Sequence, residues 1–161
     1  MSLPLASKDM AALSVDKMRA EVLAIEEWMR QAPQIEFAVT HHYAKSVYGR
    51  ELFIPKGTVL TGKIHKYSQL NVLVSGELSV LTEHGVKRVK PPFVIVSPAG
   101  TKRIAYAHED SIWLTVHGTE ETDVEKIEQQ FIAQTEQEYI AFVAQELENA
   151  ERRTERLSCP G

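Results

Sequence analysis

PKGTVLTGKIHKYSQLNVLVSG, residues 55–76, combines two turns with a strand. Glycine and proline near its ends supply the backbone angles that turns need. Between the turns, residues 69–75 form a short run rich in strand-forming residues. Because successive side chains of a strand face opposite sides, Gln69, Asn71 and Leu73 are predicted to share one face. The segment therefore predicts a β-strand between two turns, with two amide side chains on one face.

The same sequence pattern extends over about residues 35–118, where short β-rich runs alternate with glycine- and proline-containing turns. This pattern is typical of an all-β sandwich or barrel. No strand alternates with a long helix in this region, so the pattern does not favour a parallel α/β sheet. The predicted strands are residues 36–43, 48–54, 69–75, 77–82, 86–90, 93–97 and 111–117.

Helices are predicted on both sides of the β-rich region. From Val15 to Met29, apolar residues recur with alternating spacings of three and four, which indicates one amphipathic helix with Ser14 as its N-cap. Its apolar stripe could dock on the barrel or on a partner chain, and the barrel is favoured.

After the strands, residues 122–125 form a capping box in which Thr122 is expected to accept a hydrogen bond from the Glu125 amide. A second box at residues 135–138 opens a further apolar stretch, so one helix or two could follow. Residues 148–156 carry charges of both signs and are predicted to be a solvated helix end.

The 161 residues suit one domain with a single core. We predict three segments: a helical segment at 1–34, a β-barrel at 35–118 and a helical extension at 119–161. Hydrophobic residues make up 43% and charged residues 25%, as in ordinary globular proteins. The net charge of −4 gives no attraction to nucleic acid or to anionic membranes, so neither is a predicted partner.

The chain has one cysteine, Cys159, so it can form neither an internal disulfide nor a cysteine-based metal site. The first ten residues lack the pattern of a signal peptide, and no apolar run is long enough to span a membrane. These features predict a cytoplasmic protein.

Together with PAGTKR at residues 98–103, the segment at 55–76 resembles the two motifs of the cupin superfamily. In that family the first motif runs from a glycine through two histidines to an acidic residue and a turn glycine, and the second runs from a proline through a glycine to a histidine. The matching positions here are Gly57, Lys63, His65, Gln69, Gly76, Pro98, Gly100 and Arg103. The resemblance covers about half the chain. It implies a cupin-type antiparallel β-barrel, also called a double-stranded β-helix or jelly roll, with flanking N- and C-terminal α-helices.

Cupins that bind a metal use the three histidines and the acidic residue, and this chain keeps only His65 of those four. Lysine and arginine are cations and do not readily share a site with a divalent ion. No metal or other cofactor is therefore predicted. A displaced metal site, if present, would combine His65 with one of three other histidines. These are His41, His42 and His117.

The motif positions instead predict a barrel mouth rich in hydrogen-bond donors. Two cations beside neutral amides suit an anionic small molecule, and an arginine grips a carboxylate or phosphate through two parallel hydrogen bonds. The competing interpretation is that these polar side chains face solvent or satisfy one another. The predicted ligand-binding residues are Lys63, His65, Gln69, Asn71, Arg103 and Tyr106.

Three functions remain open. The first is a metal-free cupin domain that binds an anionic small molecule or acts in assembly. The second is a metal-independent enzyme, similar to cupin sugar-nucleotide epimerases and isomerases, with His65 as the catalytic base and the two motif cations, Lys63 and Arg103, stabilising charge. The third is a metal-dependent enzyme with the displaced ligand set.

The span from Val47 to the first capping box is also similar to small cupin-like proteins of tailed bacteriophages. This resemblance implies a place in the host cytoplasm but no activity. The resemblance to cupins, together with the apolar faces of the helices, further predicts a homodimer.

Overall fold

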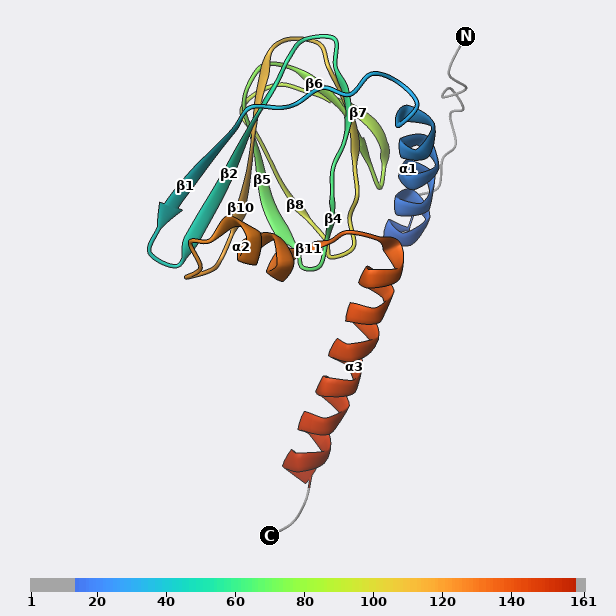
Figure 1. The fold of residues 1–161 in the computed structure, drawn as a ribbon, viewed down its shortest axis with the longest axis vertical. Helices are drawn as coiled ribbons and strands as arrows, with labels where there is room; N and C mark the ends of the chain where they lie inside the picture. The colour runs from blue at the N-terminus through green and yellow to red at the C-terminus, as the bar shows by residue number, and fades with distance from the viewer. Residues whose placement is uncertain (1–13, 159–161) are drawn as a thin grey trace.

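The structure is a computed structural model that describes residues 14–158; residues 1–13 and Cys159, on which some of the predictions depend, lie outside the described residues. Antiparallel strands make up its centre (Figure 1). The strands are β1 Val39–Ala44, β2 Val47–Ile54, β3 Val59–Thr61, β4 Ile64–His65, β5 Gln69–Ser75, β6 Leu78–Thr82, β7 Gly85–Val89, β8 Phe93–Ser97, β9 Ile104–Ala107, β10 Ser111–His117 and β11 Ile132–Ala133. The helices are α1 Val15–Met29, α2 Val124–Phe131 and α3 Glu136–Ser158.

Two sheets contribute to one core. The larger has five strands in the order β1-β2-β10-β5-β8, and the smaller has four in the order β3-β9-β6-β7. A third, two-stranded sheet pairs β4 with β11, which connects α2 to α3. This arrangement confirms the predicted cupin-type fold with flanking helices, although the strands form separate sheets rather than one continuous closed barrel.

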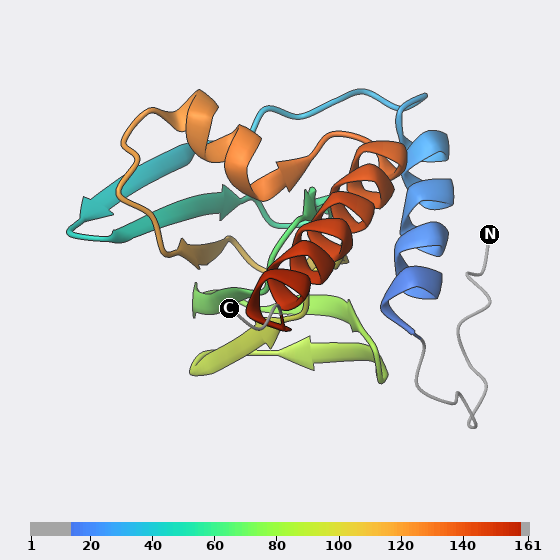
Figure 2. The same cartoon turned by 90° about the horizontal axis from the view of Figure 1, so that it is seen from below.

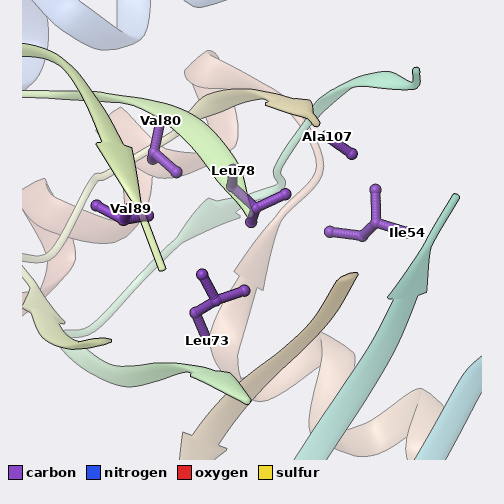
Figure 3. Packing of buried hydrophobic residues seen from close by; sticks show 6 residues of the cluster. All are labelled: Ile54, Leu73, Leu78, Val80, Val89 and Ala107. Atoms are coloured by element: carbon purple, nitrogen blue, oxygen red, sulfur yellow. The ribbon is translucent and has the colours of Figure 1, made fainter. Parts of the chain in front are cut away.

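The main hydrophobic core lies between the sheets (Figure 3). It consists of side chains that alternate strand positions direct inward from both sheets, which is the geometry expected of a pleated strand. Each of these side chains is buried, and together they hold the two sheets against each other. The cluster comprises Ile54, Leu73, Leu78, Val80, Val89 and Ala107.

Helix α1 begins where the sequence predicts, because the Ser14 hydroxyl accepts a hydrogen bond from the Lys17 amide. The helix docks on its own chain: Met18 and Val22 are fully buried. Arg19 is also buried, and its guanidinium donates to the Gly100 carbonyl at 3.0 Å and to Glu136 at 3.2 Å. It thereby joins α1 to the second motif and to the start of α3, which lie side by side in Figures 1 and 2.

The C-terminal segment forms two helices separated by β11. The predicted first capping box is wrong in detail: Asp123, not Thr122, is the N-cap, and its carboxylate accepts from the Glu125 amide at 3.0 Å. Asp123 lies one residue closer to the helix than Thr122, and its carboxylate satisfies the free Glu125 amide instead. At the second box, the Thr135 hydroxyl accepts from the Glu138 amide at 3.1 Å, as expected.

All seven predicted strands are present, with ends shifted by a few residues. The sequence interpretation missed β3, β4, β9 and β11, each of which has at most four residues. Such short segments are too short to show a period of two. None of the helices in the described part of the chain combines the length and the apolar character that crossing a membrane requires.

Candidate functional site

A cavity of about 140 Å³ lies between the two sheets. An apolar cavity of about 150 Å³ holds a molecule the size of benzene, so this cavity accepts a small organic ligand. Its far end is apolar, formed by side chains such as Leu60, Leu78, Val80 and Trp113. Its near end lies beside α2 and combines polar strand residues with the apolar Ile127, Phe131 and Ile132.

The strand register of the larger sheet separates the polar part of the cavity wall from the apolar part. Tyr48 pairs with His117, and Gln69 pairs with Ser97, at the end of the sheet nearest α2. The next inward row, two residues further along each strand, contains Arg50, Thr115 and Asn71. The row after that is apolar, with Leu52, Trp113 and Leu73 in register. The cavity wall therefore has polar groups at the end beside α2 and hydrocarbon beyond them.

Arg50 is the cation that the sequence interpretation missed. It lies on β2, lines the cavity and is half-buried. Among residues 14–158, no side chain or carbonyl forms a hydrogen bond or ion pair with its guanidinium. Its alternation with Tyr48, Leu52 and Ile54 was the signal that could have found it, because a charged residue among apolar ones on an inward face lies inside the barrel.

The predicted residues Asn71 and Arg103 do converge inside the cavity, where they form one network. The Asn71 amide donates to the Ser97 hydroxyl at 3.0 Å and accepts from Thr115 at 2.8 Å. Arg103 donates to Ser97 at 3.1 Å and to the Leu81 carbonyl at 3.0 Å, and forms an ion pair with Glu83 at 3.3 Å. The positive charge of Arg103 is thus largely balanced by protein.

Lys63 lies at the rim of the cavity rather than inside it. Its ammonium forms an ion pair of 2.5 Å with Glu128 of α2, and its side chain is 45% exposed. Lys66 reinforces this contact by donating to the Gln129 carbonyl at 2.8 Å. Both lysines therefore fasten α2 across the near end of the cavity, where Figure 1 shows this helix beside the ends of β10 and β5.

Two histidines stand between the cavity and α2. The rings of His65 and His117 are stacked with centroids 5.5 Å apart, and Phe131 stacks on His117 at 4.3 Å. Burial, with a further contribution from His117 and nearby cations, lowers the pKa of His65 to about 3. Burial and the charge of Arg50 lower the pKa of His117 to about 4. Both imidazoles are therefore neutral at physiological pH.

Two buried polar atoms at this end have no hydrogen-bond partner in the part of the chain that the structure describes. They are Nδ1 of His65 and Oε1 of Gln69, and Gln69 is only 6% exposed. Buried polar atoms without hydrogen bonds are uncommon in proteins and carry a free-energy penalty of about 1–3 kcal/mol each. A bound molecule that offers a hydrogen-bond donor to Gln69 would remove part of that penalty.

The structure places the predicted ligand-binding residue Tyr106 outside the cavity. It is 41% exposed, whereas its neighbour Ala107 is fully buried and Ala105 lines the cavity. Side chains alternate along β9, so two inward alanines place the tyrosine between them on the outer face.

The residues do not fit a metal. His41 bonds to the Tyr48 hydroxyl and His42 to Glu51, each at 2.7 Å, so neither joins His65 in a ligand set. Throughout residues 14–158, no three His, Cys, Asp or Glu side chains gather as a metal would require. At the motif position of the third cupin histidine, the cationic Arg103 occupies the space. Of the three histidines in the displaced ligand set, only His117 lies beside His65, with ring centroids 5.5 Å apart, and no third His, Cys, Asp or Glu joins them among the described residues.

Solved structures with a similar fold include several cupins. KdgF from Halomonas is 20% identical, with 57% of this chain and 88% of that chain covered and a TM-score of 0.47. An RmlC-like cupin from Shewanella frigidimarina is 16% identical over 53% of this chain and 84% of its own, with a TM-score of 0.44. A cupin superfamily protein from Desulfitobacterium hafniense is 11% identical over 72% and 95%, with a TM-score of 0.45.

No protein-family model matches the sequence, and no curated protein does. The similarities to solved structures concern the fold alone.

Proposed function

We propose that the chain is a cupin-type binding domain that takes a small organic anion into the cavity between its sheets. The observation that carries this proposal is the Arg50 guanidinium, which lines the cavity and has no hydrogen-bond or ion-pair partner among residues 14–158. A half-buried charge without a partner is unfavourable, and an anionic ligand supplies the missing partner.

Among the cations around the cavity, Arg50 is the one whose charge is not balanced by a carboxylate of residues 14–158. Lys63 is paired with Glu128, and Arg103 is paired with Glu83. Because His65 and His117 are neutral, their imidazoles add no positive charge. The surplus is therefore one positive charge, which suits a singly charged group such as a carboxylate better than a diphosphate.

The rest of the cavity specifies the remainder of the ligand. Gln69 Oε1 lacks a hydrogen-bond donor, so a hydroxyl or amine close to the anionic group would fit. The apolar far end accepts a compact hydrocarbon portion. A small carboxylic acid with a neighbouring hydroxyl or amine and an apolar body meets all three requirements.

A thermal-shift screen followed by isothermal titration calorimetry tests the proposal. Its ligands are short hydroxy and amino carboxylates, matched phosphate monoesters, and the corresponding neutral amides. At least one carboxylate should raise the melting temperature, because binding to the native state stabilises it. In Arg50→Gln, the affinity for that ligand should fall about 10- to 100-fold, as expected for the loss of a charge-assisted hydrogen bond.

Arg30→Gln is the matched control, because Arg30 is exposed at the C-cap of α1 and does not line the cavity. It should bind as the native protein does. Equal affinities of Arg50→Gln and the native protein, or preference for the neutral amides, would refute the proposal.

The catalytic alternative with His65 as a general base has less support. A histidine whose pKa is about 3 is a weak base at neutral pH, and its Nδ1 has no carboxylate to orient the ring. His65→Ala separates the two functions: loss of turnover of a bound ligand, with binding retained, would indicate an enzyme.

A further inference from the structure

Helix α3 leaves the sheets and extends beyond them (Figure 1), so most of its length has no partner in the described chain. Only its beginning packs on the core, through Tyr139, Phe142 and Val143. The large apolar residues that follow or flank this region are exposed: Ile140 by 58%, Leu147 by 61% and Leu157 by 89%. Such residues on a projecting helix indicate an interaction surface.

These residues belong to a continuous seam. Positions 140, 143, 147, 150, 154 and 157 are separated by alternating steps of three and four, which is the spacing of a coiled coil. The seam covers about 26 Å of helix at 1.5 Å per residue. It consists of Ile140, Val143, Leu147, Ala150, Thr154 and Leu157.

We propose that α3 pairs with α3 of a second copy of this chain in an antiparallel two-helix coiled coil. The sizes along the seam are self-complementary in this orientation. Ile140 faces Leu157 of the other copy, and the large Leu147 faces the small Ala150. Val143, which is half-buried against its own core, turns its remaining exposed surface toward Thr154. One surface that matches itself in this way generates a two-fold dimer.

The charges beside the seam select the antiparallel orientation. In a parallel pair, Glu146 would lie next to Glu151 of the other copy, and the two carboxylates would repel each other. In the antiparallel pair, Glu146 lies next to Arg153 of the other copy, and this attraction occurs twice. Glu146 and Arg153 form no ion pair within the described residues, so both are available.

Sedimentation equilibrium of the full chain, from a few to a few hundred micromolar, tests the pairing. The native protein should show a concentration-dependent dimer. Glu146→Arg or Arg153→Glu alone should weaken the association constant about tenfold, because each turns two attractive pairs into repulsive ones. The double variant, with both changes, should recover the native association constant because the pairs are restored with opposite sign.

Cysteine cross-linking tests the orientation in a Cys159→Ser background. Ile140→Cys and Leu157→Cys proteins should each fail to form a disulfide-linked dimer alone, whereas their mixture should form one. Position 157 of one copy lies about 26 Å from position 157 of the other in the antiparallel pair.

A native protein that stays monomeric throughout the concentration range overturns the proposal. So does a dimer that neither single charge reversal weakens, or disulfide formation by Leu157→Cys protein alone. The proposed dimer does not depend on a ligand in the cavity. Circular dichroism of each variant checks that the variant is folded.

Discussion

Arg50 and the two stacked histidines define the chemistry of the cavity at the residue scale. Burial is the main cause of the lowered pKa values of His65 and His117, and the fixed positive charge of Arg50 adds to it. The mouth presents one cation and two neutral rings, a combination that receives an anion without requiring the protein to bind a proton first.

The depressed histidine pKa values predict a pH dependence of stability. The folded state binds fewer protons than the unfolded state between the ordinary pKa of 6.5 and folded values of about 3 for His65 and about 4 for His117. Stability should therefore be fully present above pH 6.5 and fall as the pH drops, by up to about 1.4 kcal/mol per pH unit for each histidine. Urea denaturation between pH 7.5 and pH 5 measures this slope.

His65→Gln should reduce the slope by about half, since one titrating group is removed. His84→Gln is the control, because His84 is exposed in the turn before β7. An unchanged slope in His65→Gln would contradict the assignment of the dependence to this buried pair.

At the scale of elements, the motif glycines determine how strands join. Gly76 lies between β5 and β6 with a φ of +88°, a conformation that residues with a Cβ rarely adopt. A Cβ there would lie 2.5 Å from the Asp110 carbonyl oxygen and 2.6 Å from the Ser111 Cα. The turn can therefore pass close to the start of β10 only because residue 76 is glycine.

Gly76→Ala is expected to destabilise the protein by about 3 kcal/mol, from backbone strain together with displacement of neighbouring backbone. Gly57→Ala is the matched control: its φ is +80°, but a Cβ there would meet nothing within 4 Å. It should lower stability by only about 1 kcal/mol. Equal losses in the two variants, measured by chemical denaturation, would show that the close approach to β10 does not matter.

For the whole molecule, the folded unit and the exposed end of α3 are separable. Clusters of buried hydrophobic side chains lie between the two sheets and where α2 and the beginning of α3 contact the sheets. From residue 148 to 158, by contrast, every side chain except the half-buried Asn149 is exposed. The core does not depend on this end.

A chain ending after Leu147 should therefore fold with a free energy of unfolding within about 1 kcal/mol of the native value at low micromolar concentration. It should lack the proposed dimer, since half of the seam is removed. Thermal melts followed by circular dichroism measure the first effect, and sedimentation measures the second. Loss of a cooperative transition would mean that the end of α3 supports the core.

The sequence by itself determined the strands of five or more residues, the α1 helix and the positions of the motif turns. These features depend on local periodicity and on glycines that few residues can replace. It also placed Gln69, Asn71 and Leu73 on one face, because alternation along a strand needs no knowledge of its partners.

Only the tertiary structure decided which cations are free. Lys63 is paired with Glu128, and Arg103 is paired with Glu83. Each glutamate lies far along the sequence from the cation that it pairs with. Arg50 lies outside both motifs and becomes a cavity residue through its register with Thr115. Local sequence specifies the direction of a side chain along its strand, but ion pairing depends on groups that only the folded chain brings together.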